Sequence, residues 1–235
     1  MVARASVTRP SDRCPARLFR DLLFLSGIGT LSGGQAQRVA PARSLAPQPE
    51  LLLLDEPLSA LDRALREELV ITLRNIIRSL KLTVVYVTHD QDEAFSLADQ
   101  IVIMDQGKIL AVNSAEEIWT HPGSKAAAAF LGYRPFLSAA AAAKFGMEIP
   151  ERSQLAIAPG GLKMCPAGQG IAATARDLRV RRGKYLAEVS WRHGSEEYSG
   201  QAEAGLGIHL SKKQSQQKVG LKFQRDETCV VPLAT

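Results

Sequence analysis

Two carboxylates at the end of an apolar run are the residues best suited to chemistry in this chain. Four leucines, Leu51 to Leu54, are followed directly by Asp55 and Glu56. Such a run predicts a strand buried on both faces, and open α/β sheets carry their chemistry at the carboxyl ends of strands. There an aspartate can hold the water shell of Mg²⁺ on a nucleotide, and the adjacent glutamate can polarise an attacking water. A strand that simply stops at a solvated turn would look the same.

A glycine-rich turn precedes the acidic strand. Ser32, Gly33, Gly34 and Gln35 open a predicted helix that runs to about Ala46. Glycines at a helix start let backbone N–H groups approach an anion directly. The turn is therefore suited to hold a phosphate, whereas an isolated Ser-Gly-Gly is more often only a helix cap.

The residues after the carboxylates alternate between helix and strand patterns. Beyond Asp62, leucines and isoleucines recur at helical spacing up to Leu80, and an apolar strand is predicted over 82–87. His89 follows that strand at its carboxyl end. A single histidine after a strand is usually only a polar terminus.

Taken together, these segments resemble the ATPase subunit of ABC transporters. The signature sequence corresponds to residues 31–35, the Walker B strand to the run ending at Asp55 and Glu56, the loop of the dimer contact to 59–62, and the switch histidine to His89. The resemblance implies an α/β fold, namely an incomplete P-loop NTPase (ABC ATPase) domain followed by a small all-β domain of the oligonucleotide-binding (OB) type.

The same resemblance implies roles for individual residues. The signature residues 32–35 would contact the γ-phosphate of an ATP held by the opposite subunit of a head-to-tail dimer. Asp55 would act through Mg²⁺ and its water, Glu56 would be the general base, and His89 would sense the γ-phosphate. Asp62 would lie at the dimer contact, close to the nucleotide. ATP and Mg²⁺ are thus the expected cofactors.

One required motif of the family is missing from the sequence. No segment matches Gly-x-x-x-x-Gly-Lys-[Ser/Thr], the phosphate loop whose lysine and amides carry most of the nucleotide's charge. Residues 1–30 are too few for the missing strands and loop, so we expect the carboxyl-terminal part of a longer ATPase that does not hydrolyse ATP alone. Pro41 also interrupts the predicted signature helix, at a cost of about 3 kcal/mol in a helix interior.

The sequence predicts three regions. Residues 1–30 form a basic leader of uncertain order, 31–135 the carboxyl-terminal part of the ATPase domain, and 136–235 a β-barrel domain like those appended to ATPases that import sugars, polyamines or ferric iron. Ser114 and Glu117 form a capping box for a short helix. Strands in the last region are predicted over 154–158, 171–180, 185–191, 196–202, 219–223 and 228–231.

The charge distribution and the cysteine content bear on nucleic-acid binding, on the redox compartment and on metal or disulfide sites. The net charge of +5 lies wholly in 151–235, which holds 13 basic and 8 acidic residues, and basic residues cluster on the hairpin predicted over 176–184. A barrel can bind nucleic acid through such a surface, but few aromatic residues accompany it. Three widely spaced cysteines favour a reducing compartment and predict neither a metal site nor a disulfide framework.

The resemblance also implies partners. These are a second ATPase subunit, transmembrane permease subunits and, at the level of the complex, a solute-binding protein, with the chain on the cytoplasmic face of the membrane. The alternative is a noncatalytic remnant that binds a ligand, a protein or nucleic acid through its β domain. A DNA-repair ATPase, which shares the signature and Walker B motifs, is disfavoured because long heptad segments are missing.

Overall fold

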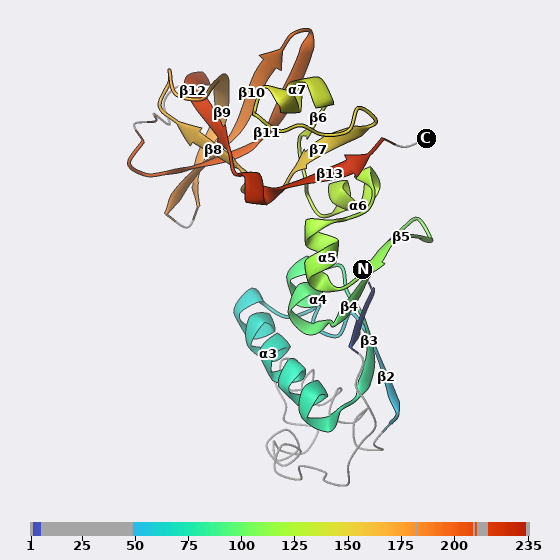
Figure 1. Ribbon diagram of the computed structural model, residues 1–235. Helices are drawn as coiled ribbons and strands as arrows, with labels where there is room; N and C mark the ends of the chain where they lie inside the picture. Colours follow the sequence, from blue (N-terminus) through green and yellow to red (C-terminus); the bar gives the residue numbers. More distant parts are fainter. Residues whose placement is uncertain (1, 6–48, 182, 209, 211–215, 234–235) are drawn as a thin grey trace. The chain divides into compact units, whose positions relative to one another are not determined.

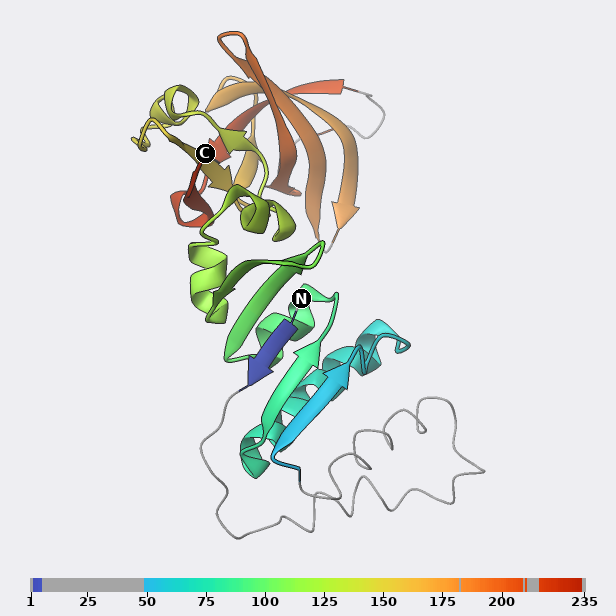
Figure 2. The same cartoon turned by 90° about the vertical axis from the view of Figure 1, so that its right-hand side faces the viewer.

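The computed structural model describes residues 2–5, 49–181, 183–208, 210 and 216–233, in two compact units (Figures 1 and 2). The first unit spans Met1–Ile118 and the second Trp119–Thr235. The division falls ahead of position 136, where the composition changes. Residues 119–135 lie in the second unit, where the N–H of Arg134 donates to the carbonyl of Ile157 at 2.8 Å, and Trp119 packs on Tyr133 with ring centroids 5.5 Å apart.

A five-stranded sheet forms the core of the first unit. Its strands follow the order β2-β3-β1-β4-β5. β2 (Leu51–Asp55) and β3 (Thr83–Val87) are parallel, with Asp55 opposite Val87, so both end at the same edge. β4 (Gln100–Asp105) and β5 (Lys108–Asn113) form the expected hairpin.

An unexpected strand lies between β3 and β4. β1 (Val2–Ala5) runs antiparallel to both neighbours, with Val2 opposite Val87 and Val102. The sequence interpretation assigned these residues to a leader of uncertain order. Four residues with one charge among them give too short a pattern to predict a strand, and the pairing comes from the two neighbouring strands.

Two helices follow the strands β2 and β3 along the chain. α3 (Arg63–Leu80) begins at Asp62, whose side chain accepts a hydrogen bond from the backbone N–H of Leu65. α4 (Gln91–Leu97) begins at Asp90 in the same way. The inner residues of α3, among them Leu73 and Ile76, are buried in one cluster with β2 and β3.

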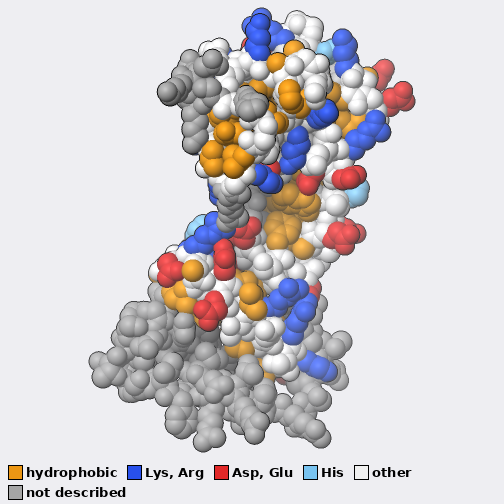
Figure 3. All heavy atoms as spheres, turned by 90° about the vertical axis from the view of Figure 1, so that its left-hand side faces the viewer, with side chains coloured by type: hydrophobic (Ala, Val, Ile, Leu, Met, Phe, Trp, Pro, Cys, Tyr) orange, Lys and Arg blue, Asp and Glu red, His pale blue; other side chains and the backbone are white. Residues whose placement is uncertain are grey.

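The prediction that the leucine strand is buried on both faces is wrong. Leu52 and Leu54 are buried, but Leu51 is 50% exposed and Leu53 67% exposed. The described helices of the first unit contribute to a core on one face of β2 only. Apolar side chains thus remain at the surface, and Figure 3 shows such groups among charged ones on one face of the molecule.

Short helices connect the sheet to the barrel region. Ser114 and Glu117 form the predicted capping box at the start of α5 (Ala115–Thr120), with Ser114 Oγ accepting the N–H of Glu117 at 3.2 Å. α6 (Lys125–Phe130) follows, capped by Ser124. The alanine tract forms α7 (Ala139–Ala143), a helix that the sequence interpretation did not predict within an all-β region.

The second unit contains a closed five-stranded barrel. Its strands follow the order β10-β11-β8-β12-β9, and its interior is filled by small, aliphatic and aromatic side chains, among them Ala187, Leu221 and Trp191. The bounds are β8 (Leu162–Cys165), β9 (Ile171–Arg181), β10 (Lys184–His193), β11 (Glu196–Gly205) and β12 (Gln216–Phe223). The predicted barrel is confirmed.

The membership of the barrel differs from the prediction. β7 (Ser153–Ile157) pairs with β13 (Thr228–Pro232) and β6 (Phe136–Leu137) in a separate three-stranded sheet, so it is not the first strand of the barrel. A short 3₁₀ turn, η1 (Arg225–Glu227), leads into β13. β8 takes the barrel position instead. It was missed because its four residues, bounded by glycines and Pro166, are too few to show a period.

Candidate functional site

The side chains of Glu56 and His89 meet at one edge of the sheet. His89 Nδ1 lies 3.0 Å from Glu56 Oε1, within hydrogen-bonding distance. Both side chains are largely open to solvent, with His89 68% and Glu56 46% exposed. The contact exists because β2 and β3 are parallel neighbours that end in register. Two residues 33 positions apart in the sequence, chosen from the sequence as general base and phosphate sensor, thus form a pair.

The backbone at Glu56 is held in an unusual conformation. Its φ is 43°, in the left-handed region that non-glycine residues rarely adopt. The N–H of Glu56 donates to the carbonyl of Val87 at 2.9 Å, and its own carbonyl accepts the Ser59 hydroxyl at 2.9 Å. Such strain persists where surrounding contacts fix it, often at functional sites. The turn after β2 therefore presents the Glu56 carboxylate in one direction.

A buried network holds the loop that carries His89. Thr88 Oγ donates to Glu93 Oε2 at 2.8 Å and accepts the N–H of Asp90 at 3.0 Å. The hydroxyl of Tyr86 donates to the same oxygen of Glu93 at 2.7 Å. Because Glu93 is only 4% exposed, these two donors stabilise a carboxylate that burial would otherwise disfavour. His89 lies between two residues of this network.

Arg66 joins the network to helix α3. Its guanidinium contacts Asp90 Oδ2 at 3.1 Å and Glu93 Oε1 at 3.6 Å, and it donates to the carbonyl of Leu61 at 2.9 Å. Burial, together with the hydrogen bond to Glu93 and its negative charge, raises the pKa of Tyr86 far above its ordinary value. The Tyr86 hydroxyl therefore remains a hydrogen-bond donor at every physiological pH. Through Arg66, Tyr86 and Glu93, the network links α3, β3 and α4.

The remaining predicted residues have different positions. Asp55 ends β2 and is exposed. Asp62 caps α3, so its carboxylate already has a structural use in addition to the dimer contact proposed for it. The signature residues Ser32, Gly33, Gly34 and Gln35, like Pro41, lie outside the described residues.

The acidic edge suits a metal that is held only partly by protein. Mg²⁺ commonly keeps several waters and is bound by one or two carboxylates together with substrate phosphates. Asp55 at the exposed end of β2 can supply one such oxygen ligand. In the described part of the chain, no three His, Cys, Asp or Glu side chains gather as a metal cluster. The residues present thus fit an ion that comes with a nucleotide rather than a dedicated protein-only metal site.

Sequence reasoning missed the residues that support the site. Tyr86 was taken only as part of an apolar strand, and Glu93 and Arg66 only as helix residues. A signal did exist, since Glu93 lies on the same helical face as the buried Ala94 and Leu97. A carboxylate on a face that is otherwise apolar needs a partner, and the parallel strand pairing determines which partner it finds.

None of the described helices is long and apolar enough to cross a membrane. The longest, α3, has 18 residues and carries charged side chains along its length.

Comparison with known proteins identifies relatives. The family described as ABC transporter matches residues 5–59. A Fe(3+) ions import ATP-binding protein of Streptomyces avermitilis is 41% identical over 196 residues, covering 77% of this chain and 56% of the relative. A spermidine/putrescine import ATP-binding protein of Borreliella afzelii is 42% identical over 157 residues, covering 61% and 45%.

A third relative extends the range of transported solutes. A sulfate/thiosulfate import ATP-binding protein of Synechocystis is 53% identical over 116 residues, covering 47% of this chain and 33% of the relative. The chain spans about half the length of the first relatives it matches. With the paired Glu56 and His89 at the carboxyl ends of parallel strands, the chain is thus similar to ATP-binding proteins of ABC import systems.

Proposed function

We propose that the chain acts as an ATP-binding subunit of an ABC import system, in which ATP hydrolysis drives the uptake of a small solute. The observation that carries the proposal is the 3.0 Å contact between Glu56 and His89 beside Asp55, at the edge where β2 and β3 end. The names of the relatives, which include importers of iron, polyamines and sulfate, support the reaction class but differ in the solute.

Glu56 has the position of the general base in this family, although the composite site proposed below leaves it unused. Its Oε1 contacts His89, and its other oxygen makes no hydrogen bond within the described residues, so it is available to orient a water. His89 positions the carboxylate and meets the terminal phosphate. Asp55 holds the metal through water, and Asp62 lies at the contact between subunits. Bound Mg²⁺-ATP supplies the phosphoryl group that is transferred to water.

The absence of a Gly-x-x-x-x-Gly-Lys-[Ser/Thr] segment in the sequence determines how the chain works with a partner. We propose that residues 32–35 complete an ATP site whose phosphate loop belongs to a second ATPase subunit in a head-to-tail dimer. In that composite site the partner also provides the catalytic glutamate, so Glu56 of this chain is idle. The dimer joins permease subunits at the cytoplasmic face of a membrane.

Mixing experiments test this arrangement. The ATPase activity of the Streptomyces avermitilis relative, diluted until it is mostly monomeric, is measured with and without an excess of this chain. The chain is expected to stimulate hydrolysis, Ser32→Arg to abolish the stimulation, and Glu56→Gln to leave it unchanged. Loss of stimulation in Glu56→Gln refutes the composite site in this form. No stimulation at all favours the alternative, a noncatalytic module that acts through its β domain.

A further inference from the structure

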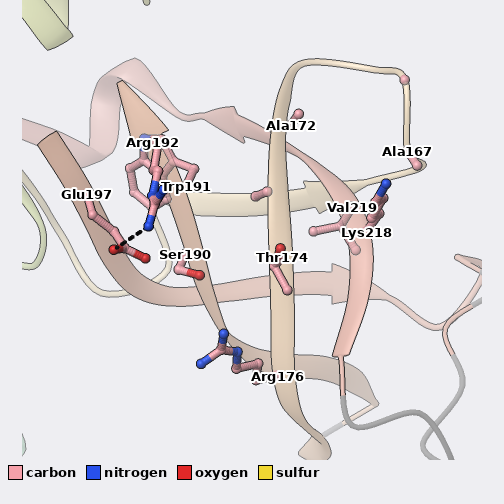
Figure 4. Close-up of a pocket in the computed structure, with 12 residues that line it drawn as sticks. Ala167, Ala172, Thr174, Arg176, Ser190, Trp191, Arg192, Glu197, Lys218 and Val219 are labelled. Carbon is pink, nitrogen blue, oxygen red and sulfur yellow. Dashed lines mark ion pairs between the residues drawn. The ribbon is translucent and has the colours of Figure 1, made fainter. Parts of the chain in front are cut away.

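A shallow depression lies on the outer face of the barrel in the second unit, whereas the candidate nucleotide site belongs to the first unit. Its volume is about 460 Å³, and it lies over β9, β10 and β12 (Figure 4). Ala167 and Gly168, in the loop between β8 and β9, form part of its wall. We propose that this depression binds a small molecule that carries a diphosphate or two closely spaced phosphate-type groups.

Strand register explains why the barrel surface is hollow here. Thr174 of β9 lies directly opposite Ser190 of β10 on one side and Lys218 of β12 on the other. Their neighbours in sequence, Ala173 and Val219, are buried in the barrel core. The row of three residues across the strands, Ser190, Thr174 and Lys218, therefore faces outward and is called the row of Thr174 below. Small side chains in the middle of the row leave space that longer side chains would fill.

The loop that forms the wall is held in place by a glycine of β12. A Cβ at Gly220 would lie 1.6 Å from the carbonyl oxygen of Gln169, so the loop runs directly over this position. Gly220 pairs with Ala172 of β9, another residue of the depression. The loop therefore lies against the outward face next to the row of Thr174 and turns a convex barrel surface into a recess.

Three cations surround the recess. Arg176 lies two residues along β9 from Thr174, on the same face, so it is a diagonal neighbour of Lys218 at about 7–8 Å between backbones. Arg192 reaches the recess from β10 (Figure 4). Within the described residues, neither Arg176 nor Lys218 forms an ion pair. Unpaired cations around a recess favour an anionic occupant.

Acidic groups near the recess are few and already engaged. Glu197 pairs with Arg192 at 3.6 Å, and both side chains are well exposed. Glu188 lies opposite Arg176 in register, but its carboxylate accepts a hydrogen bond from Gln201 at 3.4 Å. The cations therefore exceed the acids that line the recess by two.

The arrangement determines the class of ligand. Arginine presents a planar fork that matches phosphate oxygens in two places, while lysine acts as a point charge. The hydroxyls of Thr174 and Ser190 add donors at the floor. Because the cations come from three different strands, a ligand with two linked phosphate groups offers them more oxygens than a single phosphate does. Nucleic acid is disfavoured because the aromatic residue among the lining side chains, Trp191, is 4% exposed and packed inside the barrel, where no base can stack on it.

Calorimetric titration of the whole chain with pyrophosphate tests the proposal. At low ionic strength, where exposed charges are least screened, we expect saturable binding that weakens with added salt. The double variant Arg176→Gln with Lys218→Gln should weaken binding at least tenfold. Glu197→Gln should strengthen it severalfold because Arg192 is released, a gain that no unfolded variant would show. The control is Arg179→Gln on β9 outside the recess, alone and together with Arg181→Gln; the pair removes as much charge as the double variant does.

Three outcomes overturn the proposal. Pyrophosphate gives no saturable heat, Arg179→Gln weakens binding as much as the double variant does, or a twelve-nucleotide single strand binds while pyrophosphate does not. The last outcome assigns the basic surface to nucleic acid instead. Circular dichroism of each variant shows that its fold is retained.

Discussion

Removing the hydroxyl of Tyr86 tests the buried network behind the His89 loop. Tyr86 is 2% exposed, and its hydroxyl donates to Glu93 Oε2 at 2.7 Å. Tyr86→Phe keeps the ring and deletes only the donor. A hydrogen bond to a charged group contributes about 1.5–3 kcal/mol, and Thr88 still donates to the same oxygen at 2.8 Å. We therefore expect a loss of about 2 kcal/mol in the free energy of unfolding of the first unit.

Urea unfolding followed by the helical circular dichroism signal measures this loss. That signal reports mainly on the first unit, because α3 has 18 residues and the described helices of the second unit have six or fewer. The matched control is Thr83→Val in β3 of the same unit, whose hydroxyl has no described hydrogen bond, and it should change stability by less than about 0.5 kcal/mol.

A double-mutant cycle sharpens the test. Because Tyr86 and Thr88 donate to the same oxygen, Tyr86→Phe combined with Thr88→Ala should leave Glu93 without its two donors, and the double loss should differ from the sum by more than about 0.5 kcal/mol. A loss in Tyr86→Phe no larger than that of Thr83→Val, with additive effects in the cycle, would refute the idea that the network holds this loop.

Three further outcomes follow from the second unit. Gly220→Ala should destabilise the barrel by at least about 1–3 kcal/mol because its Cβ would meet Gln169 O at 1.6 Å, whereas Gly205→Ala, with nothing within 4 Å, should be nearly neutral in thermal melts. Burial raises the pKa of the Cys229 thiol to about 11. Iodoacetamide at pH 8 should therefore modify Cys229 slowly in the native chain and rapidly in urea. Equal rates of modification, followed by mass spectrometry, would contradict this expectation. Burial raises the pKa of Glu203, but Lys184 and Lys163 lower it more, so the pKa in the folded chain lies below its ordinary value. The stability that the ionised Glu203 contributes is therefore fully present above the pKa of the unfolded chain, near 4.3, and is lost as the pH falls through the lower pKa of the folded chain. Glu203→Gln should therefore flatten the pH dependence of the barrel's melting temperature below pH 4.5, and an unchanged profile would count against this.

The elements with a clear period could be predicted from the sequence, and the contacts between them could not. The 3.6-residue spacing after Asp62 predicted α3, and the apolar runs predicted β2 and β3. The meeting of Glu56 and His89 depends on parallel pairing, which the family resemblance implies but the residues alone do not. β1 was missed because four residues show no period, and its pairing arises only from two distant strands.

Burial was the weakest part of the sequence interpretation. Leu51 and Leu53 have the same side chain as Leu52 and Leu54, but only the latter two face the described helices. Composition cannot reveal which face of a strand is covered, since that depends on where helices pack. Likewise, β7 was predicted as a strand of the barrel region and pairs with β6 and β13 in a separate sheet.

The most direct test of the account is calorimetric titration of the chain alone with Mg²⁺-ATP. In the proposed composite site the signature residues of this chain meet a phosphate loop and a catalytic glutamate that both come from a partner, and the acidic edge of this chain has no phosphate loop beside it. No saturable heat is therefore expected for the chain alone. Micromolar binding that Asp55→Asn weakens would contradict the account, because it would mean that this chain forms a complete nucleotide site by itself.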